Sequence, residues 1–444
     1  MDDFLKELLD CKKYLQVRNE LIEMNIVDIA QILEELDKEK LLIIFRILPK
    51  EIAAGVFSHT PIELQQYIIE SITDKETSNI VSKLYLDDTV DFLEEMPSNV
   101  VKKVLKNTDE ETRKLINQFL NYPEDSAGSI MTIEFVDLKK HMTVAEALEH
   151  IRATGVDKET INNCFVIDEV RRLEGVVSIR KIILSDSDEI IDDIMDTDIL
   201  SANTLDDQEK IAFLFKKYDL TTLPVVDNEN RLVGIVTIDD IVDIIDEENT
   251  EDLHKMAAIQ PLEDEYLKTN AFVLAKHRIV WLMVLMLSAT LTGGIIQRYE
   301  GMLQSAVILA TFIPMLMDTG GNSGSQSSTL IIRGMALGEI STSDAFKVLV
   351  KEIKVGIIAG STLAFVNFLR LILFSKLGYL VSATVSMTLL FTVIIAKLVG
   401  GLLPLLAKKI RLDPAIMAGP LITTIVDVLA LAVYFNLATR FLSI

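Results

Sequence analysis

The sequence predicts a multidomain membrane protein with an α-helical superhelical N domain, a tandem pair of α/β units and an all-α transmembrane bundle of five helices. Charge is divided unevenly: residues 271–444 hold 14 Lys and Arg against 7 Asp and Glu, whereas residues 1–270 hold 29 against 59. The basic part contains five long apolar stretches, and a strand pattern in the acidic part recurs 59 positions later. The expected boundaries are 1–127 for the N domain, 128–190 and 191–246 for the two α/β units, 247–271 for an acidic connecting helix and 272–444 for the membrane domain.

The expected N domain shows helical periodicity that is interrupted at Pro49, Pro61 and Pro97. Proline removes a backbone donor and clashes with the preceding turn, so amphipathic runs such as 28–48 end at these positions. This pattern indicates a small superhelical array of short helices. The array contains no nucleophile with a nearby base and no Gly-rich phosphate loop, and no GxxxxGK[ST] motif occurs in the chain. We therefore expect a protein that is not an enzyme.

The two α/β units are predicted from the internal repeat. The stretch that starts at Phe165, FVID through RLEGVVSI, recurs from Pro224 as PVVD through RLVGIVTI. Each copy has the pattern of a strand, a turn, a strand with a Gly and a helix that opens at Ser or Thr. The pair resembles tandem CBS domains, which are adenosine- or ion-sensing regulatory modules.

A nucleotide site is one interpretation of the second unit. In CBS domains a Ser or Thr followed three residues later by Asp can hold a ribose and a phosphate at a helix start. Thr237 and Asp240 match this pattern, whereas Ser178 is followed at that spacing by Lys181. Binding of ATP to the second unit and ordinary helix capping by the same residues both remain open.

Acidic residues follow the second repeat at helical spacing. Like charges at i and i+4 destabilise a helix by a few tenths of a kcal/mol per pair, so this helix needs counter-charge. Divalent cations held by carboxylates and retained waters would supply it. A solvated acidic linker is the alternative. The residues are Asp239, Asp243, Glu247 and Glu251 at four-residue intervals, with Asp240, Glu248 and Asp252 beside them.

Five stretches have the length and apolar composition that a bilayer requires. Basic residues gather on the flanks that would be inside if the acidic part were cytoplasmic. We therefore expect a multi-pass protein of the cell membrane with cytoplasmic N-terminal domains and an outside C-terminus. The stretches are 278–297, 302–318, 350–374, 382–407 and 415–439.

Asp427 is a lone carboxylate midway along the apolar stretch 414–440. It lies roughly 20 Å along a helix from Pro414, where an unpaired charge costs a few kcal/mol or more. A substrate cation, a partner side chain or a water-filled path usually offsets that cost. Asp427 is therefore a candidate cation site.

The segment 318–329 is too polar for lipid contact and too rich in Gly for a stable isolated helix. Asn322 and Gln326 would face hydrated cations, while Gly320 and Gly324 form a GxxxG that equally well indicates close helix packing. Arg370 and Lys397 are interpreted as snorkelling or interhelical residues. The role of Asp318 stays open.

Charge argues against nucleic acid as a partner, and cysteine content argues against a cysteine metal site or a disulfide framework. The strongly negative soluble part repels nucleic acid and concentrates cations. Cys11 and Cys164 lie far apart and form neither a metal-ligand spacing nor a disulfide framework.

The order of these parts resembles the MgtE family of magnesium channels over essentially the whole chain. The resemblance implies a homodimer in a lipid bilayer, with a pore between ten spans in which Asp427 of both subunits holds a hydrated Mg²⁺, and with the connecting helix as a plug. The family signature is matched by Pro314, Gly320, Gly321, Asn322, Gly324 and Gln326, followed by Asp413-Pro414 and Asp427. The Mg²⁺-sensing carboxylates that the resemblance implies are Asp87 and Asp91, then Asp207, Glu209 and Asp219, then Asp240, Asp243, Glu248, Glu251 and Asp252, with Asp413 at the inner pore mouth.

Two alternatives remain at this point. One is a transporter of another divalent cation, such as Co²⁺ or Mn²⁺, because the sequence does not fix the ion rank order. The other is a membrane-anchored nucleotide sensor regulated through its CBS pair. The second alternative leaves Asp427, Asn322 and Gln326 without a role.

Overall fold

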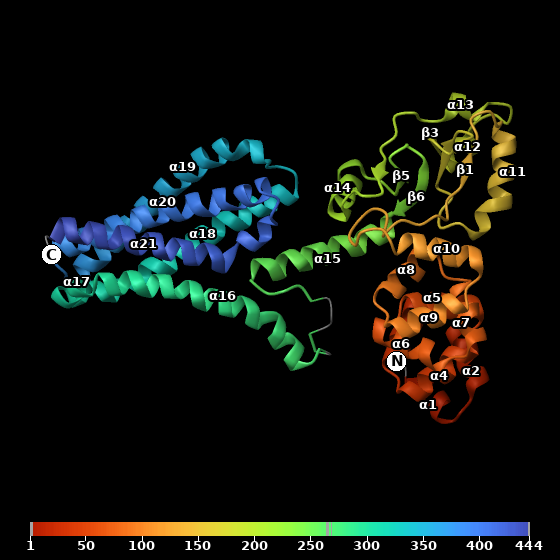
Figure 1. The fold of residues 1–444 in the computed structure, drawn as a ribbon, viewed down its shortest axis with the longest axis horizontal. Coiled ribbons are helices and arrows are strands. Elements are labelled where there is room, and N and C mark those ends of the chain that lie inside the picture. Colours follow the sequence, from red (N-terminus) through yellow and green to blue (C-terminus); the bar gives the residue numbers. More distant parts are fainter. Residues whose placement is uncertain (1–2, 263–265, 268, 443–444) are drawn as a thin grey trace. The chain divides into compact units, whose positions relative to one another are not determined.

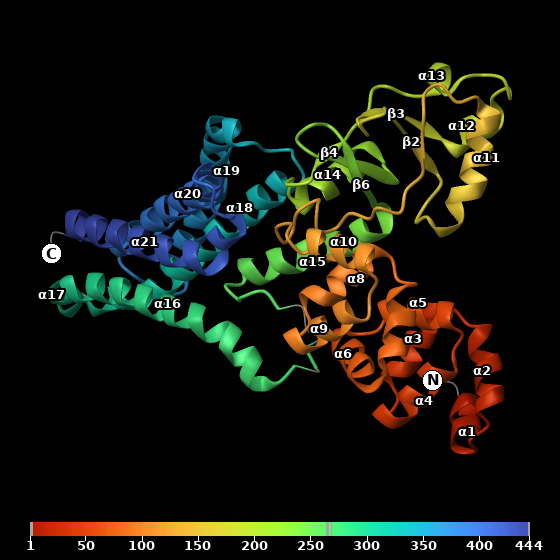
Figure 2. The same ribbon diagram turned by 45° about the vertical axis from the view of Figure 1, so that its right-hand side comes forward.

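The computed structural model describes residues 3–262, 266–267 and 269–442. It forms two compact units, residues 1–245 and 246–444, which are considered separately below. Figures 1 and 2 show the first unit in red to green and the second in green to blue.

Short helices make up the N-terminal part of the first unit, as predicted. Pro49, Pro61 and Pro97 each stand at the residue before a helix, where a missing N–H costs nothing. The rings of Phe45 and Phe92 lie 6.5 and 5.1 Å from that of Phe57 in the shared core. The helices are α1 (Asp3–Asp10), α2 (Tyr14–Ile22), α3 (Ile26–Glu34), α4 (Lys38–Ile47), α5 (Lys50–Ser58), α6 (Ile62–Ser71), α7 (Asp74–Val81), α8 (Leu86–Glu94), α9 (Ser98–Lys106) and α10 (Glu110–Phe119).

The predicted repeat forms two α/β units with the same topology. Each has a three-stranded sheet in which a parallel pair is followed by an antiparallel pair, ordered β1-β2-β3 and β4-β5-β6. The prediction of a mixed α/β pair is therefore confirmed. The elements are β1 (Asp137–Leu138), α11 (Val144–Thr154), η1 (Gly155–Asp157), β2 (Asn163–Ile167), β3 (Leu173–Ser178), α12 (Ile179–Leu184), α13 (Ile191–Ile194), β4 (Ala202–Asn203), α14 (Gln208–Tyr218), β5 (Thr222–Val226), β6 (Leu232–Thr237) and α15 (Ile238–Met256).

The acidic connecting helix has different limits from those expected. The expected helix covered 247–271, but α15 starts directly after β6 and ends at Met256. The described residues between Ala257 and Asn270 lie outside helices, and Pro261 among them could not continue one. Residues 263–265 and 268 of the expected helix lie outside the described residues.

The second unit contains four helices that are long and apolar enough to cross a membrane among the described residues. These spans cover Ala271–Arg298, Thr342–Leu373, Tyr379–Lys409 and Pro414–Leu442. The elements are α16 (Ala271–Arg298), α17 (Glu300–Ser305), η2 (Val307–Phe312), α18 (Ile313–Ala336), η3 (Thr342–Asp344), α19 (Ala345–Leu373), α20 (Tyr379–Lys409), η4 (Pro414–Met417) and α21 (Gly419–Leu442).

The span expected at 302–318 is wrong in its position. A short helix, a 3-10 turn and only the start of α18 occupy it. The continuous helix starts at Ile313 and has 24 residues, about 36 Å in length, including the whole polar segment. Helix α18 is thus long enough to be a fifth span, although its polar middle makes it less apolar than the four spans named above.

Helix α18 forms despite its glycines because it is packed against other helices rather than isolated. A side chain at Gly320 would meet Thr392 and Val426, and one at Gly324 would meet Ile422. Figure 1 shows α18, α20 and α21 side by side. Close packing by small residues, which the GxxxG pattern allowed, is what the structure shows for these glycines.

Gly400 is expected to be the most sensitive glycine, because a side chain there would collide with the backbone oxygen of Gly324. Replacing it with Ala would push α18 and α20 apart at a cost of about 2 kcal/mol. We expect Gly400→Ala to lower the melting temperature of the purified chain in detergent by about 5 °C. Gly378→Ala is the control, since a side chain there meets nothing within 4 Å. Equal melting temperatures for both variants would contradict the packing argument.

Candidate functional site

Asp427 lies on α21, the helix that packs against Gly320, Gly321 and Gly324 of α18. One turn earlier on α21, Thr423 occupies the space that a side chain at Gly321 would need. The Oδ1 atom of Asp427 is buried and has no hydrogen-bond partner among the described residues. A buried acceptor without a partner is costly, so this oxygen requires a cation, a water molecule or a group from another chain. A carboxylate oxygen is a ligand that Mg²⁺ accepts, so Asp427 fits a divalent cation site.

Polar side chains form a stripe along the exposed face of α18. Asp318, Asn322 and Gln326 are spaced by four residues and all three are exposed, whereas Gly320, Gly321 and Gly324 are buried on other faces. The structure therefore separates the predicted amides from the predicted glycines. Asp318 is close enough to interact electrostatically with Asp427. The polar stripe of α18, residues Asp318, Asn322 and Gln326, is thus left uncovered in this single chain.

Lys397 and Arg370 are held by side chains within the bundle. Lys397 is 6% exposed, and its ammonium donates a hydrogen bond to Gln326 Oε1 at 3.2 Å. The Arg370 guanidinium donates to Asn367 Oδ1 at 2.9 Å. Gln326, predicted to meet a hydrated ion, thus already shares its carbonyl with a lysine.

Glu352 is a buried acid that the sequence analysis did not single out. It is 9% exposed, and its Oε2 atom accepts a hydrogen bond from Ser327 Oγ at 2.6 Å. Its neighbours Lys351 and Lys354 give it the appearance of a charged flank before an apolar span. The one available signal was helical spacing, which places Glu352 on a different face from either lysine.

An ion-pair cluster joins the end of α15 to the loop before α21. Lys255 Nζ lies 2.6 Å from Glu251 Oε2 and 2.6 Å from Asp413 Oδ2. Burial alone would lower the pKa of Lys255, but hydrogen bonds to Asp413 and Glu251 outweigh it and raise the pKa to about 12. Burial, with Asp413 nearby, raises the pKa of Asp252 to about 6. Three predicted ligands are therefore gathered around one lysine.

The first unit brings Asp87 of α8 near Asp240 of α15, which are 153 residues apart in sequence. Asp87 is 8% exposed, and burial together with Asp88, Asp240 and Glu159 raises its pKa well above the usual value. Burial is also the main cause that raises the pKa of Asp240 to about 6 and that of Glu159 to about 7. Asp88 and Glu159 were missed because the sequence does not show that their segments meet.

Other predicted carboxylates are spread out. Asp207 and Glu209 lie at the start of α14, whereas Asp219 follows its end, 12 and 10 residues further on and about 15–18 Å away. Asp91 and Asp243 are exposed, and Glu248 is half-buried. Among the described residues, no group of three or more His, Cys, Asp or Glu side chains is arranged as a metal site.

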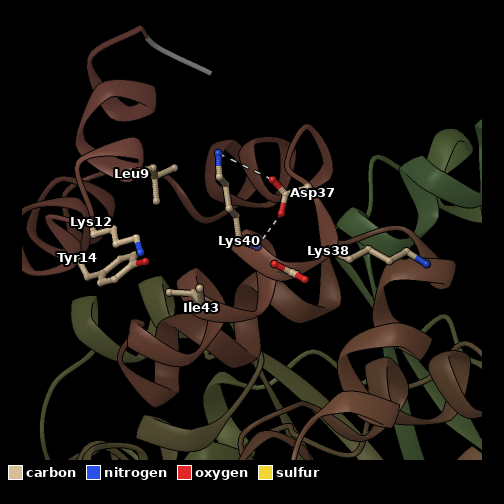
Figure 3. A pocket seen from close by; sticks show the side chains of 8 residues that line it. Leu9, Lys12, Tyr14, Asp37, Lys38, Lys40 and Ile43 are labelled. Atoms are coloured by element: carbon tan, nitrogen blue, oxygen red, sulfur yellow. Dashed lines mark hydrogen bonds and ion pairs between the residues drawn. The ribbon is translucent and has the colours of Figure 1, made fainter.

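The predicted nucleotide residues contact each other. Thr237 Oγ1 donates a hydrogen bond to Asp240 Oδ2 at 2.7 Å. In the first unit Ser178 Oγ accepts from Lys181 N, which is ordinary helix capping. A pocket at α1, α2 and α4, lined by Tyr14, Asp37 and other residues, contains none of the predicted ligands (Figure 3).

Glu159 is expected to make stability depend on pH. Its Oε2 atom is buried without a hydrogen-bond partner among the described residues. Because its pKa rises from 4.5 to about 7 on folding, the folded state binds the proton more tightly, and stability falls as pH rises through that range. Without Mg²⁺, Glu159→Gln should raise the melting temperature by about 3 °C at pH 8 and leave it unchanged at pH 4.5, since screening limits the gain to about 1 kcal/mol. Glu169→Gln, at an exposed position of the same unit, is the control. An equal rise at both pH values would contradict this origin.

Three kinds of family model match consecutive parts of the chain. A family model described as a divalent cation transporter matches residues 313–437, an MgtE intracellular N domain model matches 24–125, and CBS domain models match 127–187 and 191–247. These matches, with the long apolar helices, define a membrane transporter of divalent cations.

Relatives identify the family. The magnesium transporter MgtE of Thermus thermophilus is 36% identical over 98% of this chain and 97% of its own length. The magnesium transporter MgtE of Bacillus subtilis is 33% identical over 94% of each chain. A crystal structure of the cytosolic domain of the Mg²⁺ channel MgtE in complex with ATP is similar at 36% identity and a TM-score of 0.52, covering 54% of this chain and 98% of that one.

The chain belongs to the MgtE family of magnesium transporters. The family implies Mg²⁺ as its substrate and transport rather than catalysis as its function, which confirms the resemblance found in the sequence.

Proposed function

We propose that this protein is a Mg²⁺-selective channel that mediates passive uptake and is closed by Mg²⁺ inside the cell. The observation that supports this most is the buried, unpartnered Oδ1 atom of Asp427 beside the polar stripe of α18. Mg²⁺ gives up its waters reluctantly, so one carboxylate with amides that bond the retained waters suits it better than a tight cage. A membrane potential of about 100 mV favours inward movement of a double charge by roughly 4.6 kcal/mol, so no pump is needed.

The pore is formed between two copies of the chain. Asp318, Asn322 and Gln326 are exposed in the single chain, and lipid is a poor environment for them. A second copy would cover this stripe and enclose a polar path lined by α18 and α21 of both subunits. With α18 as the fifth span, such a homodimer has ten spans, with the N-terminal domains cytoplasmic and the C-terminus outside.

Closure depends on the acidic groups of the cytosolic part. At low internal Mg²⁺ they repel one another; at high Mg²⁺ the ions bridge them and draw α15 towards the inner end of the pore at Asp413. Lys255 already lies between Glu251 and Asp413, the position of a bridging cation. The residues that would bind regulatory Mg²⁺ are Asp87, Asp91, Asp207, Glu209, Asp219, Asp240, Asp243, Glu248, Glu251, Asp252 and Asp413.

Transport by the purified chain in liposomes tests the substrate. With a Mg²⁺-sensitive dye inside, an inward potential should drive Mg²⁺ uptake that Co²⁺ and Mn²⁺ inhibit only at higher concentration. Expression should also restore growth of a cell strain that otherwise requires added magnesium. Uptake of Co²⁺ or Mn²⁺ in preference to Mg²⁺ would overturn the proposed selectivity, and no uptake of any cation would overturn the proposed channel.

ATP binding to the second CBS unit is a further proposal. It is supported by Thr237 and Asp240 at the start of α15 and by the ATP complex of the similar cytosolic domain. Titration of the purified chain with ATP should show binding that Thr237→Ala weakens and that Ser178→Ala, in the first unit, leaves unchanged. Equal binding by both variants would place any ATP elsewhere.

A further inference from the structure

Two buried charges lie behind the polar stripe of α18 and are not explained by ion binding at Asp427. Lys397 on α20 is 6% exposed and Glu352 on α19 is 9% exposed. Lys397 lies 12 residues before the end of α20, about 18 Å along the helix, which places it within the depth of a bilayer. Charges at this depth are kept for function or for pairing.

Both groups hold neighbouring positions of α18. Lys397 Nζ donates to Gln326 Oε1 at 3.2 Å, and Ser327 Oγ donates to Glu352 Oε2 at 2.6 Å. The space for the acid is created by Gly401, where a side chain would lie 2.8 Å from Glu352 Cγ. Helices α19 and α20 thus each hold one of two consecutive residues in the polar segment.

The two charges also act on each other. Glu352 lies close enough to interact electrostatically with the Lys397 ammonium. The charges of Glu352 and Lys397 add up to zero, so a divalent cation that passes the polar stripe experiences no net charge from this buried pair. If one of the two were removed, the other would stay buried without compensation, and its field would extend to the ion path because buried charges are weakly screened.

We propose that Glu352 and Lys397 are a charge-compensating pair of positioning residues, which hold Gln326 and Ser327 in place and set how strongly the polar stripe attracts Mg²⁺. This inference rests on the proposed channel function. It predicts opposite effects of the two single substitutions. Loss of Glu352 leaves a net positive charge beside the path and weakens attraction of Mg²⁺, whereas loss of Lys397 leaves a net negative charge and strengthens it.

Mg²⁺ uptake into liposomes, measured over a range of external concentrations, tests the pair. We expect Glu352→Gln to raise the half-saturating Mg²⁺ concentration about tenfold and Lys397→Gln to lower it about tenfold. The double variant should return within about twofold of the wild-type value, because its net charge is again zero. Lys354→Gln, at an exposed position of α19, is the matched control for loss of a lysine.

A purely structural role gives a different result. Both single variants would then lose maximal rate together, with no opposite shift in half-saturation and no recovery in the double variant, and the inference would be overturned. Glu352→Asp and Lys397→Arg keep the charges, so they should keep half-saturation within about twofold even where packing lowers the yield of folded protein. If the wild-type chain itself carries no Mg²⁺, the proposed function fails instead, which separates the two outcomes.

Discussion

Asp427→Asn is expected to reduce Mg²⁺ uptake by about 100-fold, the largest effect of any single substitution. Asn keeps the size and one oxygen of the side chain but removes the negative charge. The compensation that a carboxylate offers a cation at mid-membrane is about 3 kcal/mol, which corresponds to about 100-fold in flux. Initial uptake rates into liposomes under a fixed potential measure this effect directly.

We expect the loss of Mg²⁺ uptake to depend on the position of Asp427 midway along its span, and not simply on the removal of a carboxylate from the second unit. Asp344→Asn is the matched control, because Asp344 lies at the very start of the span Thr342–Leu373 rather than midway along a span, and it is paired with Lys347 at 2.7 Å. This variant should transport at the wild-type rate. Asp427→Glu keeps the charge and should retain more flux than Asp427→Asn. If Asp427→Asn transports Mg²⁺ as fast as Asp344→Asn, the buried carboxylate is not on the ion path.

Periodicity and composition were enough to predict the fold class. The short helices after Pro49, Pro61 and Pro97 and the repeated strands follow from local signals that tertiary packing does not reverse. The span expected at 302–318 failed because a hydropathy window favours the most apolar residues. The true helix α18 is held by glycine contacts with α20 and α21, and such contacts depend on segments more than 60 residues away.

The candidate site was only partly predictable for the same reason. Asp427 stood out because its own neighbours in sequence are apolar. Glu352 did not, since the lysines beside it resemble a membrane flank, and its burial depends on Gly401 of another helix. Asp88 and Glu159 become part of an acidic group only when α8 and the segment after α11 meet. Lys255 is an ion-pair partner of Asp413 only because the chain returns to it after 158 residues, which include three of the four apolar spans.

Simultaneous neutralisation of Asp243 and Glu251 is expected to leave the channel open at internal Mg²⁺ concentrations that close the wild type. Both residues lie on α15, eight positions apart, and Glu251 shares Lys255 with Asp413. Without their charges, bound Mg²⁺ loses its preference for the closed state, and only such a preference can shift the equilibrium. Coupling of this kind is typically about 1–3 kcal/mol, so the half-closing concentration should rise by at least about fivefold in Asp243→Asn with Glu251→Gln.

Patch-clamp recording with controlled Mg²⁺ on the cytosolic side measures this shift separately from permeation. The control removes two exposed acids elsewhere, Asp157→Asn with Glu169→Gln, so that net charge changes equally in both chains. Single-channel conductance should match the wild type in both, because Asp427 and the polar stripe are untouched. Since Lys255 would keep Asp413 as a partner after Glu251 is neutralised, a small remaining closure is consistent with the proposal. Closure of the double variant at the wild-type Mg²⁺ concentration would show that α15 does not sense the ion.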